Sequence, residues 1–331
     1  MATGNPDFNT ALISTTLSNY AKTLRDQIFE NTILLSYFKK KGAVKYEDGG
    51  LSLSETLMYG TNGTVRSYSG YDEFDITPQE GMTNAVFDWK NVAGTLSISR
   101  EELRKNSGEH RIVNLVESKA RQLRMSMKDV IATMLYSDGA GNFGKDLDGL
   151  ELIVADTPTS GTVGNIDRSD ATNSWWRNWS TTGAKTTTPF DTLLGLMETM
   201  YNNCTRYGDG DNPDLIVCDQ STFEGYVSQL IQKQRFTGES ADGSFKQENL
   251  KFKGGMITWD PYCPSDATHG RMYFLNSNYL RLTVDKDTDF ITTDFITPNN
   301  QQVKTSQMLF MGNLTVTNCR KLGVIYEIDL T

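Results

Sequence analysis

Residues 109–136 read EHRIVNLVESKARQLRMSMKDVIATMLY. Apolar side chains recur here at spacings of three and four residues, which is the pattern of a helix with one buried face. The apolar positions are Ile112, Val113, Leu115, Val116, Ala120, Leu123, Met127, Val130, Ile131, Met134 and Leu135. No proline or glycine interrupts the pattern, so the sequence predicts one helix from Glu109 to Tyr136, roughly 40 Å long.

A strand pattern lies on the N-terminal side of this helix, in residues 43–98. Three candidate strands, 51–58, 65–71 and 86–99, are separated by glycines and polar residues, and apolar clusters are few for this length. A ribbon of two or three strands is marginally stable on its own. We therefore expect a long hairpin-like projection that rests on a neighbour.

The remaining N-terminal segments predict an arm and two helices. Residues 1–24 are rich in Thr, Ser and Asn and indicate an extended arm. Residues 25–41 have a helical apolar stripe with three lysines at the end, and Gly42 terminates it. Ser99 and Glu102 have the spacing of a capping box for a short helix at 99–105.

The C-terminal half alternates helices and strands after a loop-rich stretch at 137–186, and this order predicts an α+β fold. Helices are expected at 189–206 and 220–233, and strands at 215–218, 256–259, 272–275, 279–284, 308–316 and 322–329.

The amino-acid composition argues against several classes of function. The formal net charge of -9 argues against nonspecific DNA binding by the whole surface, because such binding needs Lys and Arg to displace counterions. Only two histidines, His110 and His269, are present, which weakens enzyme hypotheses. The four cysteines form no CxxC pair, so we expect reduced thiols. We expect neither a signal peptide nor a membrane span.

One glycine motif suggests nucleotide binding but has the wrong context. Residues 139–146 read GAGNFGKD, which satisfies G-x-G-x-x-G and nearly satisfies the phosphate-loop pattern. A phosphate loop follows a strand and opens a helix, whereas this stretch follows a long helix. The phosphate-loop pattern also needs a Ser or Thr at this point, whose hydroxyl binds magnesium, but the residue here is Asp146. We interpret the motif as a glycine-rich helix exit.

Three other groups have a functional and a structural interpretation. The Asp285, Asp287 and Asp289 series resembles the start of a calcium loop, but Phe290 and Ile296 replace the required Gly and Glu, so a solvated turn is favoured. Asp209 and Asp211 form a similar acidic turn. The tryptophans at 175, 176 and 179 could stack bases or sugars. Anchoring of a loop is the favoured interpretation. No catalytic pattern surrounds either histidine, and we assign no catalytic residue, metal or cofactor.

Several segments, in this order, resemble the major capsid proteins of tailed bacteriophages with the HK97-type fold. They are ATMLYSDGAG (132–141), LDGLE (147–151), GTVGNIDR (161–168), the Trp175–Trp176 pair, NPDLIVCD (212–219), LKFKG (250–254) and MYFLNSNYL (272–280). The matching sequence segments extend over residues 100–330. In the N-terminal third, only the predicted architecture is similar.

The resemblance implies a division of the chain. Residues 1–42 correspond to an N-terminal arm and helix, and residues 43–98 to an extended β-loop that overlaps a neighbouring subunit. Residues 99–149 and 286–331 correspond to a peripheral domain around a spine helix at 109–136. Residues 150–285 correspond to an axial domain.

The resemblance also implies a non-enzymatic coat protein. Hexamers and pentamers would form an icosahedral shell around double-stranded DNA, contacted without sequence specificity, in a virion assembled in the bacterial cytoplasm. Expected partners are further copies, a separate scaffold protein, a portal and decoration or cement proteins, with no membrane. Lys45 and Lys90 lie in the loop region, but no residue match supports a covalent crosslink. The alternatives are an encapsulin-type compartment and a carboxylate-based glycan hydrolase.

Overall fold

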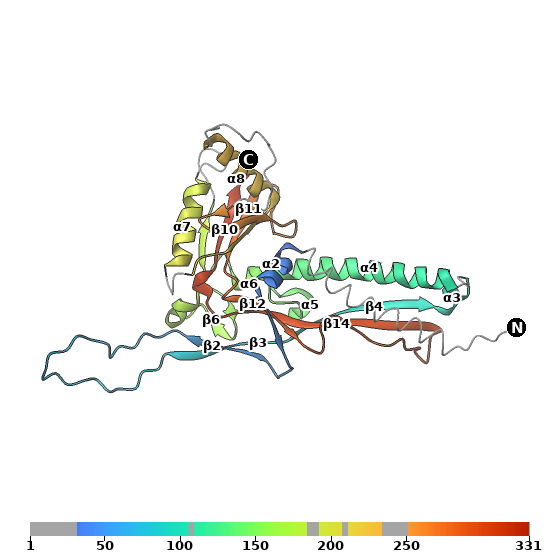
Figure 1. The fold of residues 1–331 in the computed structure, drawn as a ribbon, viewed down its shortest axis with the longest axis horizontal. Helices are drawn as coiled ribbons and strands as arrows, with labels where there is room; N and C mark the ends of the chain where they lie inside the picture. Colours follow the sequence, from blue (N-terminus) through green and yellow to red (C-terminus); the bar gives the residue numbers. More distant parts are fainter. Residues whose placement is uncertain (1–31, 106–108, 184–191, 207–210, 234–250, 331) are drawn as a thin grey trace.

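The computed structural model describes residues 32–105, 109–183, 192–206, 211–233 and 251–330. Figure 1 shows an elongated molecule with the long helix at one end, a projecting loop at the opposite end and a lobe carrying two further helices above them. The expected arm at residues 1–24 lies outside the described residues.

Helix α4 has the predicted bounds, Glu109–Tyr136, so this prediction is confirmed. Its apolar face buries Met127, Ile131 and Leu135. The helix packs against strand β4 (Lys90–Ser99) at Gly94, where a Cβ would lie 2.6 Å from a methyl carbon of Leu123. Glycine therefore lets the strand approach the helix closely.

The lower sheet joins both ends of the described chain. Strand β14 (Val303–Val316) pairs antiparallel with β4, with β12 (Leu280–Asp285) and with β13 (Ile291–Thr292). Strand β1 (Val44–Glu47) adds to β12 in parallel. The region predicted as a free ribbon thus contributes strands β1 and β4 to a sheet built mainly from C-terminal strands.

The upper sheet has the strand order β7-β15-β11-β8-β10-β9. Its strands are β7 (Trp179–Thr182), β8 (Leu215–Cys218), β9 (Lys251–Phe252), β10 (Gly255–Trp259), β11 (His269–Leu275) and β15 (Gly323–Asp329). Helices α7 (Leu193–Thr205) and α8 (Gln220–Lys233) contribute to its buried apolar cluster. The predicted strands here are confirmed: β8 has the predicted ends, and the ends of β10, β11 and β15 are shifted by one to three residues. The start of the predicted helix 189–206 lies outside the described residues.

The projection is a hairpin of β2 (Leu53–Met58) and β3 (Met82–Phe87), paired from Leu53↔Phe87 to Met58↔Met82. The expected hairpin is therefore confirmed, but two details were wrong. The predicted strand at 65–71 does not form, because this segment has no partner strand. The predicted strand at 86–99 is two strands, β3 and β4, interrupted at Asp88 and Trp89.

Helix α2 (Ile33–Lys41) covers the C-terminal part of the helix predicted at 25–41, but Thr32 has an extended backbone and is the N-cap, so the prediction was wrong at this residue. Residues 25–31 lie outside the described residues. It ends at Gly42 in the left-handed conformation, with φ of 69°. Helix α3 (Arg100–Lys105) begins with the predicted capping box: Ser99 N–H donates to the Glu102 carboxylate (3.2 Å), and Glu102 N–H donates to Ser99 Oγ (3.1 Å).

The remaining elements are short and lie mostly in the stretch predicted as loop. They are α5 (Gly141–Gly144), α6 (Leu150–Ile153), β5 (Thr162–Val163), β6 (Ile166–Asp167), η1 (Ala171–Trp176) and η3 (Cys319–Lys321).

Asp260 holds α2, α4 and the upper sheet together. Tyr136, the last residue of α4, donates its hydroxyl to the Asp260 carboxylate at 3.0 Å, and both residues are buried. Tyr262 N–H donates to the other carboxylate oxygen at 3.0 Å. Leu34 N–H, in the first turn of α2, also bonds to this carboxylate. Burial nevertheless raises the pKa of Asp260 above its ordinary value.

Candidate assembly surface

The root of the β2–β3 hairpin is buried. Leu53, Leu57, Ala85 and Phe87 point into the main apolar cluster, while Met58 and Met82 at the far end are exposed. Val86 N–H donates to the Gly164 carbonyl at 2.9 Å. A Cβ at Gly164 would lie 2.8 Å from that of Ala85, so only glycine allows this contact. The hairpin therefore leaves the body in a defined direction.

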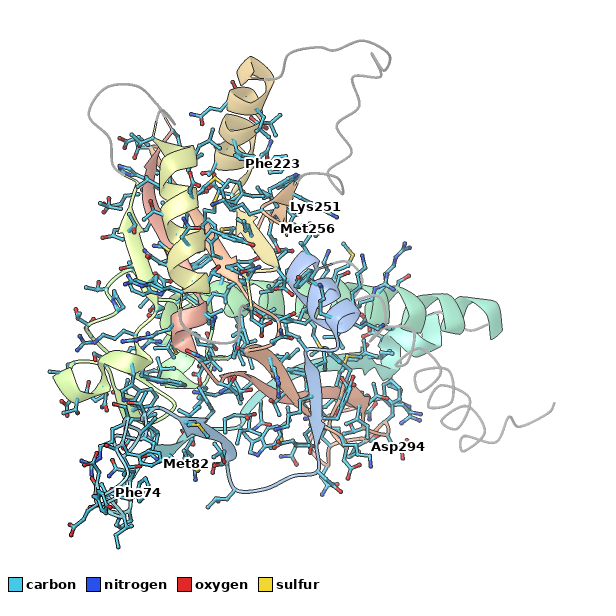
Figure 2. The ribbon with its side chains drawn as sticks, turned by 60° about the vertical axis from the view of Figure 1, so that its left-hand side comes forward. Phe74, Met82, Phe223, Lys251, Met256 and Asp294 are labelled. Carbon is cyan, nitrogen blue, oxygen red and sulfur yellow. The ribbon has the colours of Figure 1, made fainter. Side chains whose placement is uncertain are left out.

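Residues 59–81, here called the projecting loop, connect the two strands and expose large apolar side chains. Figure 2 shows Phe74 at the tip of this loop and Met82 nearer the body. Tyr71 and Ile76 are almost fully exposed, at 104% and 92%, and Val65, Tyr68 and Phe74 are also exposed. Large exposed apolar side chains gathered in one segment indicate a protein contact.

Local hydrogen bonds give the projecting loop its shape. Asn62 caps the turn at Thr64, and Asp75 caps the turn at Thr77 with bonds of 3.0 and 2.6 Å, which lower the pKa of Asp75. Arg66 donates to the Glu73 carbonyl across the loop. The rings of Tyr68 and Phe74 lie 5.0 Å apart. The loop presents its apolar side chains on an ordered backbone.

The projecting loop is also acidic. It carries Asp72, Glu73, Asp75 and Glu80 against the single cation Arg66, so its formal charge is -3. A surface that combines aromatic rings with negative charge suits a partner with apolar and basic groups.

Two of the tryptophans anchor their own loop to the body, as the favoured interpretation of the cluster predicted, and one of them also contacts the projecting loop. The Trp175 ring stacks on Tyr59 with centroids 4.9 Å apart. Buried Trp176 donates Nε1–H to the Val163 carbonyl at 3.0 Å. Trp179, by contrast, belongs to strand β7. Sequence reasoning missed Tyr59 as the partner, because no local pattern relates it to Trp175.

The glycine motif forms a helix exit and has no phosphate-loop geometry. Asn142 and Phe143 have positive φ angles of 48° and 61° in the tight turn after α4. The carboxylate of Asp146 fills the space beside Gly141. Lys90 donates to the Gly144 carbonyl at 2.6 Å and lies 3.8 Å from Asp148. Local hydrogen bonds therefore account for the motif.

The acidic candidates are not brought together as a metal site. Asp285 accepts a hydrogen bond from Gly49 N–H, and Asp211 accepts from the Tyr279 hydroxyl. Asp209 lies outside the described residues. No group of three His, Cys, Asp or Glu residues in the described part of the chain could hold a metal ion.

The histidines are likewise separate from the projecting loop. His269 lies on β11 between Asp266 and Asp329, with nitrogen–oxygen distances of 3.3 and 3.7 Å. His110 is in the first turn of α4.

Lys45, a lysine of the extended-loop region, forms ion pairs with Glu47 and Glu55 at 2.8 and 3.2 Å. Across the described helices, none is long and apolar enough to cross a membrane.

Solved structures share this arrangement along most of the chain. The capsid protein of Cyanophage A-1(L) superimposes with a TM-score of 0.66, at 14% identity, over 86% of this chain and 90% of that one. The chain has the HK97-type capsid fold. The capsid protein of an empty GTA particle matches with a TM-score of 0.59, at 10% identity, over 87% of this chain and 95% of that one.

An encapsulin has the same fold. The SrpI encapsulin of Synechococcus elongatus PCC 7942 matches with a TM-score of 0.51, at 12% identity, over 87% of this chain and 85% of that one. Neither a protein-family model nor a curated protein sequence matches the chain. The HK97-type fold is thus supported by three-dimensional similarity at identities too low to carry function.

Proposed function

We propose that this protein is the major capsid protein of a tailed bacteriophage, and that copies of it assemble as hexamers and pentamers into an icosahedral shell around double-stranded DNA. The observation that carries the proposal is the projecting loop: an ordered, acidic segment that exposes apolar side chains far from the core. In a fold shared with capsid proteins, a second copy is the natural partner for such a surface.

The proposal assigns the molecule a structural role without catalysis. Residues 43–98 would include the extended loop that overlaps a neighbour, residues 150–285 the axial domain, and residues 99–149 with 286–331 the peripheral domain. Residues 1–42 would form the arm. Portal, scaffold and decoration proteins would be further partners, and assembly would take place in the bacterial cytoplasm.

An encapsulin-type compartment is the second candidate, favoured by the shared fold of the Synechococcus protein. The two candidates predict the same self-assembly but different contents: packaged DNA in one case and protein cargo in the other. Genes for a portal and a terminase beside this gene would support the virus, and their absence beside a cargo-enzyme gene would support the compartment.

The loop's role is tested by replacing residues 61–79 with a short Gly-Ser linker, which leaves strands β2 and β3 intact. We expect the variant to remain folded, because the replaced residues contribute no side chain to the buried core. Electron microscopy of negatively stained samples should show shells for the natural chain and unassembled subunits for the variant. Normal shells from the variant would contradict the proposed role of the loop.

A further inference from the structure

Asn62 and Gly63 form the only Asn-Gly pair in the sequence, and both residues are exposed in the projecting loop. In such a pair the backbone nitrogen of glycine can attack the side-chain carbonyl carbon of asparagine, because glycine has no Cβ to obstruct the approach. The reaction is intramolecular, so it needs no enzyme and no cofactor. Whether the folded chain permits it depends on the geometry around the two residues.

The side-chain oxygen of Asn62 accepts two hydrogen bonds from Thr64. The Thr64 N–H donates to Oδ1 at 2.9 Å, and the Thr64 hydroxyl donates to the same atom at 2.6 Å. Together they form an Asx turn around Gly63. When a nucleophile adds to the amide carbon, negative charge develops on Oδ1, and donors that already point at this oxygen stabilise the charge. The turn therefore favours attack on the Asn62 amide.

A second turn in the same loop shows that donors in this arrangement stabilise negative charge. Asp75 Oδ1 accepts from the N–H and the hydroxyl of Thr77 at 3.0 and 2.6 Å, so a carboxylate stands where the first turn has an amide. The two bonds lower the pKa of Asp75, because they favour its charged form. The same turn geometry thus accommodates an asparagine and an aspartate, which is one product of deamidation.

The backbone nitrogen of Gly63 is available for the reaction. Its N–H forms no hydrogen bond with any residue in the described part of the chain, so no bond has to break first. A Cβ built on Gly63 would meet only Gln79 Oε1, at 3.4 Å, and the φ of Gly63 lies outside the left-handed region. Space is therefore present for the tetrahedral intermediate, and alanine can replace Gly63 without backbone strain.

We propose that Asn62 is a self-modification site that deamidates in the folded protein. The Gly63 nitrogen forms a bond to Cγ of Asn62 and gives up its proton, the side-chain amide leaves as ammonia, and a cyclic succinimide remains. Water then adds to either carbonyl of the ring. Opening on one side gives aspartate, and opening on the other gives isoaspartate, in which the main chain runs through the side-chain methylene. The chemistry does not depend on the proposed function.

Peptide mass spectrometry of the full chain, incubated at mildly alkaline pH, tests the modification. The peptide that contains Asn62 should gain the mass difference between an amide and an acid, and an isoaspartyl methyltransferase should label it. Asn84, an exposed asparagine followed by alanine, is the internal control and should stay unchanged. If Asn62 stays intact while a synthetic peptide of residues 58–68 deamidates, the fold blocks the reaction and the proposal is overturned.

Two substitutions test the roles of the nucleophile and of the donor separately. Gly63→Ala places a Cβ beside the attacking nitrogen, so deamidation should become several-fold slower. Thr64→Val removes the hydroxyl and keeps the N–H, so the rate should fall about fivefold, the rate equivalent of one hydrogen bond. An unchanged rate in Gly63→Ala would overturn attack by the Gly63 nitrogen. An unchanged or faster rate in Thr64→Val would overturn the role of its hydroxyl.

Deamidation should also change assembly, and this consequence rests on the proposed function. Either product adds one negative charge to a loop whose formal charge is already -3, and a charge placed in a contact must be desolvated. Aged natural chain should therefore give fewer shells than Gly63→Ala chain aged for the same time. Equal yields would overturn this consequence. A natural chain that never assembles would contradict the proposed function, while the mass measurement still decides whether Asn62 deamidates.

Discussion

The ring of Trp175 lies against the ring of Tyr59, with centroids 4.9 Å apart and planes 19° from parallel. Tyr59 is the first residue of the projecting loop, and Trp175 belongs to η1 in the body of the protein. This stack joins the loop to the body beyond the end of β2, so we expect it to restrain the motion of the loop.

Removing the stack should loosen the loop with a small effect on overall stability. An offset aromatic pair contributes about 0.5–1.5 kcal/mol beyond its buried area. For Tyr59→Ala we expect cleavage within residues 59–81 by a protease of broad specificity to become several-fold faster. Tyr71→Ala is the matched control, because Tyr71 is fully exposed and anchors nothing. Equal cleavage rates for the two variants would mean that the stack does not restrain the loop.

Charging the apolar tip should impair assembly without unfolding the protein. Ile76 is 92% exposed, so Ile76→Asp should change the free energy of unfolding by no more than about 0.5 kcal/mol. A carboxylate at this position would be desolvated in a contact, so we expect a large loss of shells measured by sedimentation. Gln79→Ser, in the same loop, is the control. The prediction is wrong if Ile76→Asp assembles as efficiently as the control.

Removing the hydrogen bond between Tyr136 and Asp260 should lower the free energy of unfolding by an amount that depends on pH. The Tyr136 hydroxyl stabilises the charged carboxylate, so Tyr136→Phe raises the pKa of Asp260 further. At pH 8 the free energy of unfolding of the variant should be lower by about 1.5–3 kcal/mol, the range for a hydrogen bond to a charged group.

The direction of this pH dependence follows from the raised pKa of Asp260. Because burial raises the folded-state pKa of Asp260, its contribution to stability is greatest below the ordinary carboxyl pKa and is lost as pH rises through the raised value. The cost of Tyr136→Phe should therefore shrink as pH falls. Denaturant unfolding at several pH values measures this, and an Asp260→Asn background should abolish the pH dependence. A cost that is independent of pH in the natural background would count against this mechanism.

Alanine substitutions at two glycines should change the stability of the protein in opposite directions. A Cβ at Gly149 would overlap the carbonyl oxygens of Ser137 and Met134 at the exit of α4, so Gly149→Ala should cost about 1–3 kcal/mol or more. Gly195, inside α7, has open space around its Cβ position, and Gly195→Ala should stabilise by about 0.5–1 kcal/mol. Thermal unfolding of both variants measures the contrast, which two shifts in the same direction would refute.

Elements specified by local sequence were predicted well. Helix α4 has the predicted ends because its apolar spacing is uninterrupted. The Ser99–Glu102 capping box is a spacing of three residues within one turn. Strand β8 is a short apolar run with the predicted ends, Leu215 and Cys218. In each case, neighbours in the chain supply the decisive contacts.

Features that depend on distant residues were not predictable. The pairing of β4 with β14 and the Tyr136–Asp260 bond join residues far apart in the chain, and no local pattern signals them. The strand predicted at 65–71 failed for the related reason that a strand needs a partner.

Electron microscopy of the purified natural chain, negatively stained over a range of salt and protein concentrations, distinguishes a shell subunit from a protein that does not assemble. We expect hexamers and pentamers in equilibrium with closed icosahedral particles. A homogeneous monomer under every condition, including co-expression with a scaffold protein, would contradict this expectation.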